Sequence, residues 1–172
     1  MSMHRLKLWI VAAGVAVVLA PAAYAQKEAA AKAPSISKAV AKQVKTAQDA
    51  IKKEKWADCV AALQSTEAVA DKPPYDVFAV AELLGFCAAR NGDTAGAEAA
   101  FSKGLEAGFL DDANRLIRYK QLLQLNYNLK AYERAAGFGE QAIAAGNTEE
   151  PVALLTAQSY YLLNDFKRTT GF

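Results

Sequence analysis

Histidine is almost missing from this sequence. The single copy among 172 residues is His4, which lies in a segment with the pattern of a cleaved leader. A mature chain without histidine has no Ser–His or Cys–His couple and no imidazole ligand for a metal ion. The sequence also lacks a G-x-S-x-G motif, a phosphate-binding P-loop and a dinucleotide-binding glycine fingerprint. We therefore predict that the protein is not an enzyme and that it holds no cofactor and no metal ion.

Long alternating runs of β-branched residues are absent as well, so we expect no β-sheet. The chain is 53% hydrophobic, and alanine is abundant. Its aromatic residues mostly stand singly at helical intervals. This composition favours an all-α globular fold over a disordered chain.

Residues 1–25 have the pattern of a secretory signal peptide. Arg5 and Lys7 give a basic start, residues 8–20 are uncharged and apolar, and small residues surround a cleavage site after Ala25. The apolar run of 13 residues is shorter than the roughly 20 residues needed to span a bilayer. We therefore expect cleavage without stable membrane insertion, and an exported bacterial protein located in the periplasm or secreted.

Charge in the mature chain is balanced in number but not in position. From Gln26 onward there are 18 basic and 18 acidic side chains, which gives no support to a nucleic-acid partner. Residues 26–55 carry eight lysines and three acidic residues. We interpret this segment as a solvated linker and helix surface, with contact to a membrane surface or an acidic partner as the alternative. Residues 26–38 are predicted to form a flexible linker.

Residues 83–101 contain the pattern of two amphipathic helices joined by a tight turn. Gly92 suits a left-handed helix end, and Asp93 suits the cap of the next helix. Similar helix pairs are predicted at about 39–70, 75–107 and 112–145, with a fourth that begins near 149. Equivalent positions recur from pair to pair at the same offsets, as in the set Trp56, Thr94, Tyr132 and Phe166, the set Cys59, Ala97, Ala135 and Thr169, and the trio Leu63, Phe101 and Gly139.

The interval between the last two pairs is the roughly 34-residue period of the tetratricopeptide repeat (TPR) family, and the earlier intervals are slightly longer. The pattern of Leu84-Gly85, Ala97 and Phe101 also resembles that family. The resemblance covers about residues 39–172. It implies an all-α fold, a right-handed superhelical solenoid of antiparallel helix pairs with about three and a half repeats. The small residues Gly85 and Ala97 are expected to let the two helices of a pair approach closely.

The same resemblance implies that the first helix of each pair lines a concave groove for a peptide or another protein segment. Carried over residue by residue, the groove positions are Gln48, Lys52, Glu82, Phe86, Arg90, Lys120, Gln124, Tyr127, Asn128, Gln158 and Tyr161. Aromatic rings, amides and both charge signs suit an extended peptide better than a polyanion. For the aromatic members the alternative is packing between repeats, and for the polar members it is a merely solvated face. We expect a protein interaction scaffold, with end-to-end self-association within an envelope complex as the alternative function.

Two cysteines, Cys59 and Cys87, fall on neighbouring helices of the predicted solenoid. Export makes a disulfide bond an open alternative. We favour two buried thiols, because the slot of Cys59 holds Ala97 and Ala135 in the next repeats.

Two further features concern helix ends. The acidic pairs Asp111-Asp112 and Glu149-Glu150 precede predicted helices, so we interpret them as caps and not as a cation site. At the C-terminus the repeat is still in register when the sequence reaches Phe172. We therefore expect an exposed apolar end, which a longer repeat array or self-association would cover, with Val152, Leu155, Tyr160 and Leu163 incompletely buried.

Overall fold

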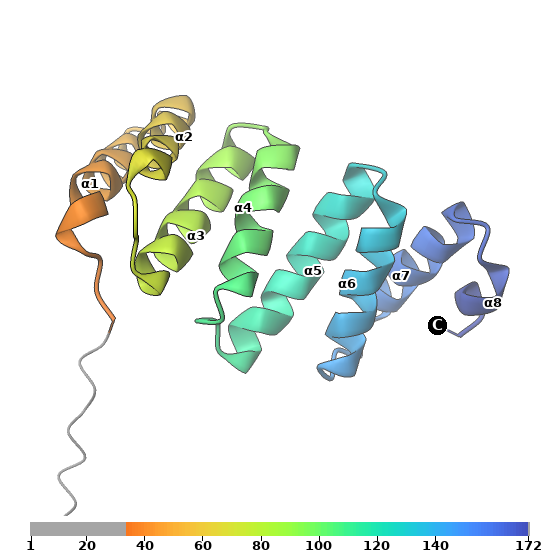
Figure 1. Ribbon diagram of the computed structural model, residues 1–172. Helices are drawn as coiled ribbons and strands as arrows, with labels where there is room; N and C mark the ends of the chain where they lie inside the picture. Colours follow the sequence, from red (N-terminus) through yellow and green to blue (C-terminus); the bar gives the residue numbers. More distant parts are fainter. Residues whose placement is uncertain (1–33, 172) are drawn as a thin grey trace, which may run out of the picture. The chain divides into compact units, whose positions relative to one another are not determined.

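The helices follow one another as antiparallel pairs (Figure 1). The computed structural model describes residues 34–171, and within them no strand occurs. The helices are α1 (Lys38–Lys52), α2 (Trp56–Gln64), α3 (Pro74–Arg90), α4 (Thr94–Glu106), α5 (Asp112–Asn128), α6 (Tyr132–Ala144), α7 (Glu150–Leu162) and α8 (Phe166–Thr169), with a short 3-10 helix η1 (Ser65–Ala68) after α2. This confirms the predicted all-α solenoid. The predicted signal peptide, and the part of the predicted linker before residue 34, lie outside the described residues.

The turns inside the helix pairs have a backbone feature that repeats at the same intervals as the sequence pattern. Each pair has one residue with positive φ, and these residues are Glu54, Gly92, Lys130 and Asn164. Each of them stands two positions before the first residue of a second helix, so the backbone repeats with the same intervals as the sequence. A left-handed residue ends a helix because the chain can no longer continue its i to i−4 hydrogen bonds. Only the second pair has glycine there, so the other three accept the steric cost of a side chain.

The start of the first pair is held by the second pair. Ser37 caps α1 by accepting a hydrogen bond from the amide of Ala39, at 3.2 Å. Its own amide donates to Oδ1 of Asp76 at 2.9 Å, and its hydroxyl donates to Oδ2 of the same carboxylate. Asp76 is fully buried in α3, so these bonds satisfy a carboxylate that would otherwise be costly to bury. Ile36, just before the helix, packs against the hydrophobic core that α1 shares with α2 and α3.

The acidic residues before α5 and α7 behave differently from each other. Asp111 caps α5, because its Oδ1 accepts from the amide of Asn114 at 2.8 Å. Glu149 makes no capping bond to α7. Its carboxylate instead accepts from Lys120 at 2.6 Å, and its amide donates to the side chain of Asn147. The capping prediction is therefore wrong for Glu149, since its longer side chain reaches the neighbouring α5 helix.

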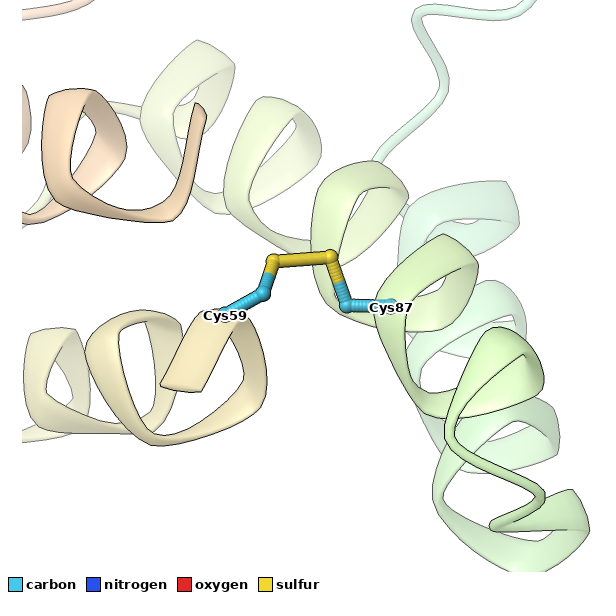
Figure 2. The surroundings of a disulfide bond; sticks show 2 residues. All are labelled: Cys59 and Cys87. Carbon is cyan, nitrogen blue, oxygen red and sulfur yellow. A yellow bond between two sulfur atoms is a disulfide. The ribbon is translucent and has the colours of Figure 1, made fainter. Parts of the chain in front are cut away.

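Cys59 of α2 and Cys87 of α3 form a disulfide bond between the first and second pairs (Figure 2). Both residues are fully buried in a core that also contains Val40, Ala47 and Leu63. Our favoured interpretation of two free thiols is therefore wrong. The two Cα atoms lie 6.1 Å apart, a separation that a disulfide can bridge.

Gly85 of α3 lies against the ring of Phe101 of α4 within the second pair. A Cβ added to Gly85 would lie 2.5 Å from Cε1 of Phe101, so the ring of Phe101 fills the space that a side chain would need. The glycine therefore faces this aromatic ring, and Ala97 is fully buried in the core cluster that contains Phe101. The equivalent positions of the third pair hold Leu123 on the first helix and Gly139 on the second. A Cβ added to Gly139 would lie 2.9 Å from Cβ of Thr156, so this glycine faces α7 of the next pair.

The C-terminal helices expose apolar side chains, but not all of those predicted. Val152 and Tyr160 are buried, so the expectation that they lack cover is wrong. They point toward α6, where Tyr160 donates a hydrogen bond to Glu140. Leu163 is exposed as expected, together with Leu154, Tyr161, Leu162 and Phe166. Among residues 34–171, no helix combines the length and apolar character needed to cross a membrane.

Candidate binding surface on the first helices

The predicted groove positions lie on α1, α3, α5 and α7, and we call the surface they form the first-helix face. Eight of its predicted members are exposed, namely Gln48, Lys52, Phe86, Arg90, Gln124, Asn128, Gln158 and Tyr161. Lys120, Tyr127 and Glu82 are only partly accessible. Lys120 pairs with Glu149 as described above, and the other two are held by neighbouring helices.

Each aromatic member of the first-helix face packs edge-on against the ring that begins a second helix. The ring centroids of Phe86 and Trp56 lie 5.8 Å apart, those of Tyr127 and Tyr132 5.6 Å, and those of Tyr161 and Phe166 5.7 Å. Edge-to-face pairs of this kind are favourable for aromatic quadrupoles. Phe86 and Tyr161 nevertheless remain 43% and 59% exposed. They therefore combine packing between helices with an accessible ring surface.

A shallow hollow of about 310 Å³ opens on this face between α3, α4 and α5. Its wall consists mainly of apolar groups, and its lining residues are Phe86, Ala89, Arg90, Phe101, Gln121, Gln124 and Leu125. The guanidinium of Arg90 lies 4.9 Å from the ring centroid of Trp56, which places a cation over an aromatic face at the edge of the hollow. Three predicted groove residues thus meet at one site, and Phe101, Gln121 and Leu125 were not foreseen there.

Glu82 lies apart from this exposed set. Its carboxylate forms an ion pair with Arg118 of α5 at 2.5 Å, and the Arg118 side chain is 9% exposed. The Arg118 guanidinium also stacks on the ring of Phe101, 3.8 Å from its centroid. Burial raises the pKa of the Glu82 carboxyl, and Arg118 opposes that shift. Burial likewise lowers the pKa of Arg118. This pair joins the second and third repeats.

A second polar contact joins the same two repeats around Glu98 of α4. Its carboxylate accepts from Asn126 of α5 at 3.1 Å, from Ser102 at 3.0 Å and from Arg134 of α6. Sequence reasoning missed this network. A signal was present, because the pairs Glu82–Arg118 and Glu98–Arg134 are both separated by 36 residues, close to the repeat length.

In the described part of the chain, no group of three or more acidic, cysteine or histidine side chains is arranged so that it could hold a metal ion. The first-helix face offers aromatic edges, amide donors and acceptors, and one stacked guanidinium. These groups can hold an apolar side chain and hydrogen-bond an extended backbone, but they include no nucleophile with an adjacent base.

Comparison with known proteins finds a likeness in fold only. Neither a scan against protein families nor a search of curated proteins gives a match. Among solved structures, the chain is similar to one described as "Functional Characterization of Pseudomonas Aeruginosa pilF". The two share 16% identity with a TM-score of 0.50, over 75% of this chain and 55% of that chain. This chain therefore spans about half the length of that protein, and the likeness supports a TPR-like helical solenoid.

Proposed function

We propose that this protein is an exported, non-catalytic scaffold whose first-helix face binds an extended segment of a partner protein. The observation that carries the proposal is the apolar hollow beside two partly exposed rings, Phe86 and Trp56. Aromatic residues and arginine are enriched in protein interfaces relative to the rest of the surface, and this hollow combines both. The amides of Gln121 and Gln124 also line the hollow, and in this proposal they hydrogen-bond the backbone of the bound segment.

Position-specific cross-linking in cells of the native host tests this function. A photo-reactive benzophenone amino acid replaces Gln124 at the hollow, and a matched replacement of Glu133, exposed on α6, serves as the control. We expect one protein to cross-link through position 124 and not through position 133. Equal cross-linking at both positions, or none at either, would overturn the proposal.

Export is the second part of the proposal, and the support for it is the pattern of residues 1–25. Its test is separate from the first. The N-terminal residue of the protein recovered from the host is determined, and the cell fractions are probed with an antibody. We expect Gln26 at the N-terminus and the protein outside the cytoplasm. A cytoplasmic chain that begins at Met1 would refute export and leave the binding function open.

A second candidate function is end-to-end assembly, which is favoured by the exposed apolar side chains of α7 and α8. Leu154 is 52% exposed and Phe166 57%. Light scattering of the purified mature chain measures self-association, and Leu154→Lys is expected to abolish it. Ile117→Lys is a matched control, because Ile117 is 51% exposed on α5, away from this end. A wild-type monomer at high concentration would exclude this candidate.

A further inference from the structure

Arg90 is the one arginine of residues 34–171 whose charge has no carboxylate partner. The four others each form an ion pair, namely Arg115 with Asp112, Arg118 with Glu82, Arg134 with Glu98, and Arg168 with Asp165. The guanidinium of Arg90 has only the ring of Trp56 beneath it. Stacking on a ring satisfies neither the charge nor the five N–H donors of the side chain. Arg90 therefore presents unused charge-assisted donors to solvent.

This guanidinium stands at an apolar hollow. Arg90 and Phe86 are four residues apart on α3, so their side chains lie on the same side of the helix. Phe86, Ala89, Phe101 and Leu125 provide the apolar wall, and no acidic side chain contributes to the lining. The volume of about 310 Å³ is at the small end of the range for ligand sites, which is roughly 300–1,000 Å³.

The other cations of the first-helix face have partners of their own. Lys120 contacts Glu149 at 2.6 Å, and Lys52 lies 3.5 Å from Asp49. The remaining exposed polar members of the face on α1, α3, α5 and α7 are neutral amides. The uncompensated charge of this face is thus a single positive charge at the hollow. One such charge favours one carboxylate, whereas a nucleic acid needs several cations along its backbone.

We propose that the site takes an extended protein segment in which a large apolar side chain stands close to a carboxylate. The apolar side chain occupies the hollow against Phe86 and Leu125, and the carboxylate accepts hydrogen bonds from Arg90. Planar pairing between a guanidinium and a carboxylate gives both energy and orientation. This inference rests on the proposed binding function and adds the chemistry of the ligand. The carboxylate belongs either to an Asp or Glu side chain or to the end of the partner chain.

A random peptide library displayed on phage, with each peptide fused through its N-terminus so that its C-terminal carboxylate is free, tests the proposal. The library is selected on the mature protein, and in parallel on Arg90→Glu. We expect the wild type to enrich peptides in which Phe, Trp or Leu stands near an acidic residue or at the free C-terminus, and the charge-reversed variant to lose that preference. Enriched peptides are then synthesised with a free or an amidated C-terminus, which separates the two sources of the carboxylate.

Titrations of the synthetic peptides give the quantitative outcome. Arg90→Gln is expected to weaken binding about tenfold, since a charge-assisted hydrogen bond is lost. The matched control Arg115→Gln removes the same charge from an exposed pair outside the hollow and should leave the affinity unchanged. The affinity for the wild type should also fall with added salt. Circular dichroism verifies that both variants are folded.

Four outcomes would overturn the inference. Enriched peptides that bind equally well without an acidic residue and with an amidated C-terminus, or equal affinity for wild type and Arg90→Gln, would show that Arg90 does not bind a carboxylate, and the binding function would survive. Equal losses in Arg90→Gln and Arg115→Gln would indicate general electrostatics. If no peptide is enriched and position 124 also gives no cross-link, the inference and the proposed function fail together.

Discussion

Replacing Gly85 by alanine is expected to destabilise the protein, although alanine is the better helix former. In the middle of a helix the change from glycine to alanine is worth about 0.5–1 kcal/mol of stability. The new Cβ, however, would lie 2.5 Å from Cε1 and 2.8 Å from Cγ of Phe101. Carbon atoms normally approach to roughly 3.5–4.0 Å. Arg118 covers one face of the ring, 3.8 Å from its centroid, and blocks its retreat on that side. With an overpacking cost of about 1–3 kcal/mol, we expect a net loss of about 0.5–2 kcal/mol.

Gly137 provides the matched control for this substitution. It lies inside α6, and a Cβ added to it would have no neighbour within 4 Å. Gly137→Ala should therefore gain about 0.5–1 kcal/mol from helix propensity alone. The assay is urea unfolding of each variant of the mature chain, followed by circular dichroism at 222 nm. The same chemical change is thus expected to have opposite signs at two helix-interior sites.

The reasoning is refuted if Gly85→Ala is as stabilising as Gly137→Ala. A double-mutant cycle with Phe101→Leu tests the assigned cause. The single Phe101→Leu change leaves a cavity and should destabilise the protein. Added to Gly85→Ala, it should cost less than it does alone, because the methyl group then occupies space that the ring has left. If the losses of unfolding free energy of the two single variants simply add in the double variant, the ring of Phe101 is not what clashes with the methyl group of Ala at position 85.

Reduction of the Cys59–Cys87 bond, which joins residues 28 apart, should lower the free energy of unfolding by about 3 kcal/mol; urea unfolding with and without reductant measures this, and coincident curves would contradict it. Asp111→Ala should lower the melting temperature at neutral pH. Because hydrogen bonds from Asn114 hold the pKa of Asp111 below its ordinary value of 3.8, the unfolded state takes up the proton first. The stability from Asp111 is therefore present above pH 3.8 and is lost as pH falls through the lower folded-state pKa. The difference in melting temperature between wild type and Asp111→Ala should therefore disappear there, and a difference that persists to the lowest pH would refute this. Tyr161→Ala should lower the free energy of unfolding by less than about 1 kcal/mol. Tyr127→Ala, which removes a half-buried ring, should lower it by about 1–2 kcal/mol. Equal losses in urea unfolding would contradict the expectation that the more buried ring contributes more to stability.

The sequence was sufficient to predict the helix pairs, because its signals are local. Turn residues such as Gly92 and the apolar spacing within each helix act over a few residues. The repeat intervals then placed equivalent helices in register, and the residues with positive φ angles follow the same intervals.

Contacts between repeats were harder to predict, because they depend on where side chains reach once the helices are packed. Glu82 was assigned to the groove from its position on α3, yet its carboxylate reaches Arg118 on α5. Glu149 was assigned to a helix cap and instead reaches Lys120. The disulfide depends on the separation of two Cα atoms, and no local pattern specifies that distance. Of the candidate site, individual residues were predicted, whereas the hollow they form with α4 was not.

The two glycines of the second and third pairs limit how this array can recombine. Gly85 makes room for Phe101 within its own pair, whereas Gly139 of α6 makes room for Thr156 of α7, which belongs to the next pair. A duplication of the third pair would set Leu122, the residue 34 positions before Thr156, against Gly139. The exchange of whole pairs therefore preserves the first fit but not the second. An insertion, deletion or duplication that keeps the third and fourth pairs together retains both fits, and such events are the ones expected to yield a folded protein.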